Sequence, residues 1–328
     1  MNRRSFAVSV VALFCVSSLA LAAEQKQVLF LTKSAGFQHS VITRDSKDPT
    51  KLAHAERLLT EFGAANGFMV TVTKDADVFN DPETYKKYDV FAFYTTGDLT
   101  TPSDKYDVKR DEKGQPVKGP DGKTTRGALL HTEKPMSKEG KAMFLKAIED
   151  GKGFIAFHCG SDTFHKGPNS EMVRPTGKYD VDPYIEMVGG EFKGHGSQQK
   201  ATMKVASNAF PGLEDLKDFG FVEEWYNLYN LDPNMHVILV QDTTSMPAKN
   251  GQREENYRRP PYPATWAKKY GNGRVFYTSM GHREDVWTNP VFQKVVIAGL
   301  NWAAGNTKFE PSPNMQQTAP QPTAAAVK

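Results

Sequence analysis

The chain has 328 residues, of which 39% are hydrophobic and 24% are charged, a composition typical of globular proteins. Its formal net charge at pH 7 is only +3, and its lysine and arginine residues are scattered along the sequence. This distribution lacks the basic stripe that binds nucleic acid, so we expect no nucleic-acid partner.

The N-terminal residues 1–22 have the pattern of a secretory signal peptide. Arg3 and Arg4 precede an apolar run, and residues 20–22 form a small-x-small cleavage site. The Arg-Arg-Ser-Phe order also fits a twin-arginine signal, so both the Sec and the twin-arginine routes stay open. We expect a periplasmic or extracellular protein that is not membrane-bound after cleavage, because no later segment has the length and apolar character of a spanning helix.

The mature chain is expected to fold without disulfides. Once the signal peptide is removed, Cys159 is the only cysteine left, so stability must come from a hydrophobic core. The last residues, 306–328, are rich in Pro, Ala and Gln, a composition typical of a disordered tail. Between these ends we find no internal repeat and no clear linker, and we expect one domain over residues 26–305.

In chain order, the first half alternates between apolar strands and amphipathic helices. The expected strands are 27–34, 68–75, 88–98 and 154–158, and the expected helices are 51–67 and 137–153. This alternation predicts a doubly wound, mainly parallel sheet with helices on both faces. In such sheets, ligands bind outside the carboxyl ends of the strands.

The second half continues the pattern. A short helix and a loop are expected over 184–196, strands at 201–207, 236–243, 263–270 and 273–282, and a last helix at 289–305. Residues 100–136 are rich in Gly, Pro and Lys, which indicates an insertion. Because this insertion follows the carboxyl end of a strand, we expect it on the ligand side of the sheet.

Polar side chains gather where the predicted strands end. The histidines at these positions are His39, His158, His195 and His282, and the carboxylates include Asp98, Asp162, Glu223 and Glu224. Carboxyl ends of parallel strands share one edge of the sheet, so these groups are expected to meet in one cleft. A single histidine is usually structural, but four at equivalent strand ends indicate a shared functional site.

Several chemistries are open to these groups. Cys159 follows a strand, but the Gly-x-Cys-x-Gly pattern of a nucleophile elbow is absent, which favours a buried thiol. A divalent metal ion could be held by His158, His195 and His282, although no local spacing such as His-Glu-x-x-His supports it. Metal-free acid–base catalysis by the same groups is as consistent, with Asp162 or Glu224 orienting a histidine.

Residues 222–231 place two carboxylates beside aromatic rings. Such a combination suits a sugar, because the rings stack on its C–H face and polar groups hold its hydroxyls. A half-buried, alternating strand is the structural alternative. Neighbouring residues of a strand point to opposite faces, so Glu223 and Glu224 are not expected to form the carboxylate pair of an ordinary glycosidase.

With these motifs the chain resembles the ThuA-like (trehalose-utilisation) family, from about Lys26 to Gly305. The segments that carry the resemblance are TKSAGFQHS, YTTGD, GFIAFHCGSDTF, MVGGEFKGHGSQQKATMKV, VEEWYNLY and ATWAKKYGNGRVFYTSMGHRED. The family has a flavodoxin-like fold similar to that of class I glutamine amidotransferases. Here His158 stands where those enzymes carry their cysteine, so the resemblance does not extend to glutaminase activity.

By this resemblance, the protein works in sugar catabolism, in association with a dehydrogenase that oxidises glycosides to 3-keto sugars. The residues expected to bind the sugar or glycoside are His39, Thr96, Asp98, Glu223, Trp225 and Tyr226, and those expected to catalyse are His158, Asp162, Glu224 and His282. Family members often have Asp-Glu-Trp-Tyr where this chain has Glu-Glu-Trp-Tyr, a departure that could shift one carboxylate.

The reaction that fits a 3-keto-glycoside is elimination followed by hydration. The C3 carbonyl acidifies the C2 hydrogen, a base removes it, the C1 substituent leaves, and water then adds. His158 or His282 is the expected base or metal ligand, and Glu224 the expected acid. Two alternatives stay open: a non-catalytic carbohydrate-binding or scaffold module, and an ordinary glycosidase with paired carboxylates.

Overall fold

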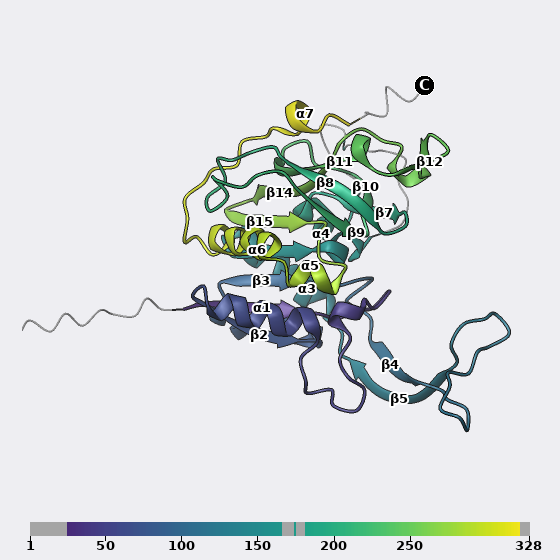
Figure 1. The fold of residues 1–328 in the computed structure, drawn as a ribbon. Coiled ribbons are helices and arrows are strands. Elements are labelled where there is room, and N and C mark those ends of the chain that lie inside the picture. Colours follow the sequence, from purple (N-terminus) through teal and green to yellow (C-terminus); the bar gives the residue numbers. More distant parts are fainter. Residues whose placement is uncertain (1–24, 166–173, 175–180, 322–328) are drawn as a thin grey trace, which may run out of the picture.

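The computed structural model in Figure 1 describes residues 25–165, 174 and 181–321. The strands of its central sheet are β1 (Lys26–Leu31), β2 (Phe68–Thr73), β3 (Val90–Phe93), β6 (Gly153–Phe157), β8 (Gln199–Val205), β9 (Phe219–Glu223), β11 (His236–Asp242), β14 (Tyr262–Tyr270) and β15 (Gly273–Thr278). They lie in the order β2-β1-β3-β6-β15-β14-β11-β8-β9. Neighbours from β2 to β15 pair in parallel and those from β15 to β9 pair antiparallel, so among the described strands of this sheet β14 and β8 alone run against the others. The predicted α/β class with a mainly parallel sheet is confirmed.

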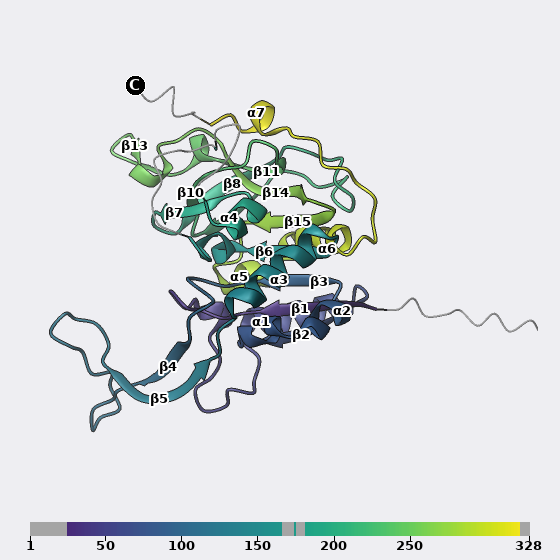
Figure 2. The same cartoon turned by 180° about the vertical axis from the view of Figure 1, so that it is seen from behind.

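Helices cover both faces of the sheet, as a doubly wound fold requires. The helices are α1 (His54–Ala64), α2 (Pro82–Lys87), α3 (Lys138–Glu149), α4 (Pro183–Val188), α5 (Glu284–Trp287), α6 (Pro290–Ala303) and α7 (Met315–Thr318). Figure 1 shows α1, α5 and α6 in front of the sheet, and Figure 2 shows α2, α3 and α4 on its other face. The sheet is therefore the middle layer of three.

The central strands β3 and β6 carry the apolar runs VFAF and GFIAF and are buried along their whole length. Strands covered by helices on both sides need apolar residues on both faces. Phe93 of β3 stacks on Phe144 of α3 with ring centroids 5.0 Å apart, and it meets Phe154 of β6 edge-on at 5.2 Å. These contacts fix the centre of the sheet, whose carboxyl ends carry the polar motifs.

The segment 191–196, predicted as a loop, instead contains strand β7 (Glu191–His195). It pairs antiparallel with β10 (Tyr226–Tyr229) in a small separate sheet, and His195 lies opposite Tyr226. The prediction is wrong because β7 is short and its partner lies far along the chain, so its own residues show no strand period. This pairing brings two of the candidate site residues side by side.

The residues 100–136 form an arm. It contains β4 (Ser103–Val108) and β5 (Arg126–Glu133), which pair antiparallel and extend away from the central sheet in Figure 1. At the base of the arm, the Lys105 ammonium donates a hydrogen bond of 2.6 Å to the Ser34 carbonyl. Because Ser34 follows β1, the arm is attached at the edge of the sheet where the polar motifs gather.

Residues 306–321 do not form the disordered tail that we predicted for 306–328. They include α7, in which Met315 is fully buried. The side chain of Asn314 donates to the Val237 carbonyl at 3.0 Å and accepts from the Val237 amide at 2.6 Å. A few such anchors hold a segment whose overall composition is typical of disorder, and the end of the tail lies outside the described residues.

The signal peptide predicted at residues 1–22 lies outside the described residues, so its cleavage and the export route stay predictions. Within the part of the chain that the structure describes, no helix has both the length and the apolar character needed to cross a bilayer.

A buried ion-pair network ties α1 to the ends of β1 and β2. Glu56 of α1 is fully buried and accepts hydrogen bonds from the Thr32 hydroxyl at 2.5 Å and the Arg44 guanidinium at 2.8 Å. Its carboxylate lies 3.5 Å from the Lys74 ammonium, which also donates to the Ile42 carbonyl at 2.7 Å. Burial alone would raise the pKa of Glu56, but Lys74, Arg44 and Thr32 together bring it below its usual value.

Replacing Glu56 by glutamine leaves the Lys74 ammonium buried without its carboxylate. We expect the free energy of unfolding to fall by about 3 kcal/mol, measured by urea denaturation. Glu61→Gln is the matched control, because Glu61 lies on the same helix with a side chain that is 56% exposed. That variant is expected to stay within about 0.5 kcal/mol of the wild type.

The same variant has a pH signature with a defined sign. A carboxylate whose folded-state pKa is depressed stabilises the fold above its usual pKa, and this stabilisation is lost as the pH falls through the folded-state value. The stability difference between wild type and Glu56→Gln will therefore narrow at acid pH. Two results would contradict the stabilising role of the network. One is an equal loss of unfolding free energy in Glu56→Gln and Glu61→Gln, and the other is a stability difference between wild type and Glu56→Gln that widens at acid pH.

Candidate functional site

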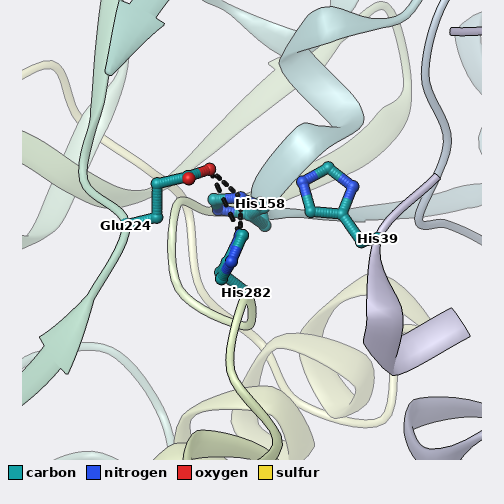
Figure 3. A group of neighbouring side chains, drawn as sticks. All are labelled: His39, His158, Glu224 and His282. Atoms are coloured by element: carbon teal, nitrogen blue, oxygen red, sulfur yellow. Dashed lines mark hydrogen bonds and ion pairs between the residues drawn. The ribbon is translucent and has the colours of Figure 1, made fainter. Parts of the chain in front are cut away.

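Three histidines and one glutamate meet at the carboxyl edge of the sheet (Figure 3). His39 comes after β1, His158 follows β6 directly, and His282 follows β15. Glu224 comes directly after β9. One nitrogen or oxygen atom from each of the four side chains lies within 4.8 Å of the others. We call His39, His158, Glu224 and His282 the histidine–glutamate cluster.

His158 stands in a strained turn at the end of β6. Its φ angle is +40°, a left-handed backbone conformation that residues other than glycine rarely adopt. The turn is tight, since a Cβ at Gly160 would lie 2.7 Å from that of Ala156. The Tyr277 hydroxyl donates to the His158 carbonyl at 2.7 Å. The strand therefore ends in a sharp elbow that presents an imidazole.

Three atoms of the cluster form a compact triangle. Glu224 Oε2 lies 3.2 Å from His282 Nδ1 and 3.5 Å from His158 Nε2, and these two nitrogens are 3.3 Å apart. The other ring nitrogen of His158, Nδ1, lies 2.9 Å from the Ser279 carbonyl. This hydrogen bond makes Nδ1 the protonated nitrogen of the neutral ring and leaves a lone pair on Nε2, which faces the cluster.

The charges of the cluster follow from burial and mutual contact. Burial lowers the pKa of His39 to about 2, and burial also lowers that of His158, so both rings are neutral at pH 7. Burial would lower the pKa of His282 too, but the nearby Glu224 outweighs it and raises the pKa. Burial alone would raise the pKa of Glu224, but its contacts with His158 and His282 hold that pKa well below its usual value.

An ionised Glu224 accepts a proton and does not supply one. This charge state differs from the expected role of Glu224 as the acid that protonates the leaving group. The reason is the surrounding imidazoles, which the sequence could not place around this carboxylate. Because Glu224 raises the pKa of His282, the protonated ring is the form that this ion pair favours.

Glu223 holds the loop that carries His282. It is fully buried, and its Oε2 accepts from the amides of Gly281 at 2.8 Å and His282 at 3.1 Å. Its Oε1 accepts from the Glu224 amide at 3.0 Å. Burial raises the pKa of Glu223 to about 7. These contacts are with backbone amides, so Glu223 is a positioning residue for His282 and not the sugar contact that we expected.

The two glutamates also differ from the expectation that they point to opposite faces of one strand. Residues 222–231 do not form a single strand, because β9 ends at Glu223 and β10 begins at Tyr226 in another sheet. The break lets both carboxylates reach His282, Glu223 at its backbone and Glu224 at its ring.

His195 and Tyr226 form the outer side of the site. His195 Nδ1 lies 3.3 Å from Glu224 Oε1, and its side chain is 43% exposed. The Tyr226 ring packs against the His158 ring with centroids 4.1 Å apart, and it stacks on the His195 ring with centroids 6.0 Å apart. The metal set that we predicted included His195, but the structure groups His39 and Glu224 with His158 and His282 instead.

Thr96 and Asp98, two predicted sugar contacts, have local structural contacts. The Thr96 hydroxyl donates to the Phe37 carbonyl at 2.8 Å and accepts from the Gly36 amide at 3.2 Å, which ties down the loop leading to His39. Asp98 is exposed and accepts from the amide and hydroxyl of Thr100, so it caps its own turn. Neither residue is in the cluster.

Asp162 and Trp225 also lie outside the cluster. Asp162 contacts the ring of His165 at 2.9 Å, and this contact raises the pKa of His165. Trp225 is fully buried, and its indole donates to the Gln199 carbonyl at 2.9 Å. The other three tryptophans of the chain are fully buried as well. Trp225, which was expected to contact a sugar, is therefore part of the core.

Three residues of the site were not found by sequence reasoning. Ser279 supplies its carbonyl to His158, and Gln198 places its amide 2.9 Å from Nε2 of His282. Tyr94 packs against His39 with ring centroids 5.5 Å apart, and its hydroxyl donates to the Gly281 carbonyl. Tyr94 and Ser279 stand in the strand-end motifs YTTGD and TSMGH, but carbonyl contacts leave no signal in residue type.

The thiol next to His158 is not an activated nucleophile. Cys159 is free and fully buried, and burial raises the pKa of its thiol well above the usual value. A thiolate is the reactive form of cysteine, so this position disfavours nucleophilic chemistry. The structure agrees with the interpretation of Cys159 as a buried thiol.

A doubly wound sheet with a polar cluster at its carboxyl edge defines a class of α/β proteins that bind ligands at strand ends. The sequence model of the ThuA family, described as trehalose utilisation, matches residues 127–303, which is over half of the chain. The chain belongs to this family, and the resemblance noted in the sequence is confirmed. Membership gives the protein a role in carbohydrate metabolism.

Solved structures support the fold. A putative ThuA-like protein from Bacteroides uniformis matches with a TM-score of 0.58 and 16% identity, covering 91% of this chain and 98% of that one. A putative ThuA-like protein from Parabacteroides merdae matches with a TM-score of 0.53 and 14% identity, covering 88% and 95%. A comparison with curated proteins finds no match. At these identities the likeness concerns the fold alone.

Replacing Glu223 by glutamine tests its positioning role. A glutamine side chain offers one acceptor oxygen and would set an NH₂ group against a backbone amide. We therefore expect the free energy of unfolding to fall by about 2 kcal/mol, measured by urea denaturation. The neighbouring Val222→Thr, at a side chain that is 41% exposed, is the control and is expected to be near neutral. Unchanged stability in Glu223→Gln would mean that other contacts hold the His282 loop.

Proposed function

We propose that the protein is an exported enzyme of carbohydrate catabolism that cleaves 3-keto-glycosides at the histidine–glutamate cluster. The observation that carries the proposal is the convergence of His39, His158, His282 and Glu224 at the edge of the sheet where α/β proteins bind ligands. The family's role in carbohydrate metabolism supports a sugar as the substrate, and the association of the family with 3-keto sugars supports the oxidised form.

The proposed reaction is redox-neutral and its atoms balance. A base takes the C2 hydrogen as a proton, and the electron pair of the C–H bond moves toward the C3 carbonyl. The C1–O bond to the aglycone then breaks, and the leaving oxygen takes up a proton. Water adds across the C1–C2 double bond, with its hydroxyl on C1 and a proton on C2. The products are the free 3-keto sugar and the alcohol, so the net result is hydrolysis.

The roles of the side chains follow from their charge and exposure. The developing negative charge on the C3 oxygen needs positive charge nearby, and the raised pKa of His282 favours the protonated ring that would supply it. His195 is the exposed imidazole beside Glu224, so it can reach a substrate and exchange protons with water. We assign the transfer of the C2 proton to His195. The buried His39 and His158 would line the part of the site that holds the C3 carbonyl.

The two alternatives find less support. A carbohydrate-binding module would stack sugars on exposed aromatic rings. Phe37 beside His39 is exposed, but all four tryptophans of this chain are fully buried, and a binding module has no need of the clustered histidines. An ordinary glycosidase needs two available carboxylates, but Glu223 is enclosed by backbone amides and Glu224 by histidines. Both alternatives remain outcomes of the assay below.

Two further elements of the proposal concern the protein's surroundings. A secretory or twin-arginine leader at residues 1–22 would deliver the enzyme to the periplasm or beyond. Its substrate is a ketone, so a sugar 3-dehydrogenase is the class of enzyme that must act before it in the same pathway.

The activity is tested by following aglycone release from α- and β-linked 3-keto-glucosides and from their unoxidised parents. Release from the keto substrates alone is the expected result. His195→Gln is expected to lower kcat/KM by about 10²- to 10⁴-fold, since it removes the acid–base group. His131→Gln is the control, because His131 is exposed on the arm, outside the cluster. Turnover of parent glycosides alone would establish the glycosidase alternative, and sugar binding without turnover the binding module.

Export is tested by expressing the full chain with its leader and sequencing the N-terminus of the secreted form. Cleavage after the small-x-small site predicts a mature protein that begins at Ala23. Replacing Arg3 and Arg4 together by lysine is expected to abolish export if the twin-arginine route is used, and to leave it intact if the Sec route is used. An uncleaved protein retained in the cytoplasm would contradict the prediction.

A further inference from the structure

We propose that the histidine–glutamate cluster binds one divalent first-row transition-metal ion of the zinc type. Three imidazoles and one carboxylate are a donor set that such ions prefer. The four side chains come from four different strand ends, and each offers one ligand atom within 4.8 Å of the others. Figure 3 shows them facing a common point, with His39 and Glu224 on opposite sides.

The spacing of the inner three atoms matches a metal shell. The distances among Glu224 Oε2, His282 Nδ1 and His158 Nε2 are 3.2, 3.3 and 3.5 Å. Zinc–ligand bonds of about 2.0–2.1 Å in a tetrahedron set the ligands roughly 3.3 Å apart. The ligand atom of His39 lies within 4.8 Å of the others, so its ring would have to move inward to complete a tetrahedral shell.

The surroundings of His39 bear on its role as a ligand separately from these distances. Its side chain is only 2% exposed, and its Nδ1 has no hydrogen-bond partner among the described residues. Instead, the ring meets those of His158 and His282 edge-on, with centroids 5.0 and 5.2 Å apart. Burial of a polar ring without hydrogen bonds is costly. In Figure 3 the other nitrogen, Nε2, faces the cluster, so this ring offers Nε2 as a ligand atom.

The surrounding contacts orient the ligands as metal sites require. The Ser279 carbonyl fixes Nδ1 of His158 and turns Nε2 toward the cluster, and Glu223 holds the backbone of His282. At the outer nitrogen of His282, the Gln198 amide lies 2.9 Å away. The oxygen of that amide accepts a hydrogen bond from Arg283 at 2.9 Å. A ring bound to metal through Nδ1 carries a proton on Nε2, so metal binding would require the amide to rotate and to give up the Arg283 contact.

The donor set selects the kind of ion. Imidazole suits zinc, iron, cobalt, nickel and copper, whereas magnesium and calcium prefer oxygen ligands. When bound, such an ion supplies a Lewis acid that polarises a carbonyl oxygen, and zinc accepts an additional ligand during catalysis. This role rests on the proposed function, because the C3 carbonyl would be that oxygen. With an ion bound, His282 would be a neutral ligand, and the ion would supply the positive charge in place of the His282 proton. The binding itself is independent of any sugar.

The inference is tested by metal analysis of the full chain after treatment with a chelator. The stripped protein is titrated with Zn²⁺, Co²⁺ and Mg²⁺ in turn, and the bound metal is counted by elemental analysis after desalting. We expect one equivalent of Zn²⁺ or Co²⁺ per chain, a visible absorption band typical of tetrahedral Co²⁺, and no retained Mg²⁺. Zn²⁺ is also expected to raise the melting temperature.

Variants locate the ion. Glu224→Gln and His282→Gln are each expected to weaken Zn²⁺ binding by at least about 100-fold, since each removes a ligand. His165→Gln and His131→Gln are matched controls outside the cluster and are expected to bind as the wild type does. Circular dichroism of each variant separates loss of a ligand from loss of the fold. The conservative Glu224→Gln keeps the test usable if a histidine variant does not fold.

Three outcomes would overturn the inference: no equivalent bound, full binding by both ligand variants, or retention of Mg²⁺ in preference to Zn²⁺. In the first case the cluster is a hydrogen-bonded group that shares protons, not a metal centre. The proposed function fails separately. Zinc bound at the cluster without turnover of keto-glucosides refutes the proposed activity alone. Turnover that survives the chelator with no metal present refutes only the catalytic role of the metal, and the binding is then decided by the titration.

Discussion

The candidate site depends on the common direction of four strands. β1, β6, β15 and β9 all point toward one edge of the sheet, so the residues that follow them converge there. His39, His158, His282 and Glu224 are far apart in the sequence, and a reversed strand would send its side chain to the opposite edge. The aromatic packing of β3 and β6 and the Glu56 network therefore serve the site indirectly, because they hold these strands and the segment after β1 in place.

Around the cluster, buried backbone contacts do most of the positioning. Glu223 binds the amides of residues 281 and 282, Tyr277 binds the His158 carbonyl, and the Ser279 carbonyl binds the His158 ring. The left-handed turn at His158 is strained, and these contacts compensate for it. The outcome is a set of imidazoles that are held apart from water and kept mostly neutral, with an ionised Glu224 among them. Such a set has the composition needed to bind a cation or to stabilise developing charge, which is the basis of both proposals.

Much of the fold was predictable because local patterns carried it. The runs VFAF and GFIAF predicted β3 and β6, and polar residues after them marked the carboxyl edge. The strand-end rule also found His158, His282 and Glu224. Non-local pairing was not predictable: β7 depends on β10, and their separate sheet breaks the strand that we expected over 222–231. Because of that break, Glu223 binds the loop of His282 and does not face a sugar. Trp225 was expected to contact a sugar because of its residue type, but it is buried in the core.

The central claim is that a C2 proton of a 3-keto-glycoside is removed and replaced at this site. The most direct measurement is the reaction in D₂O, with the hydrogen at C2 of the released 3-keto sugar followed by NMR and a sample without enzyme as the control for spontaneous exchange. Elimination followed by hydration predicts deuterium at C2 in step with aglycone release, and faster than in the control. A released sugar that keeps its original C2 hydrogen would contradict the account, because direct displacement at C1 leaves that bond intact.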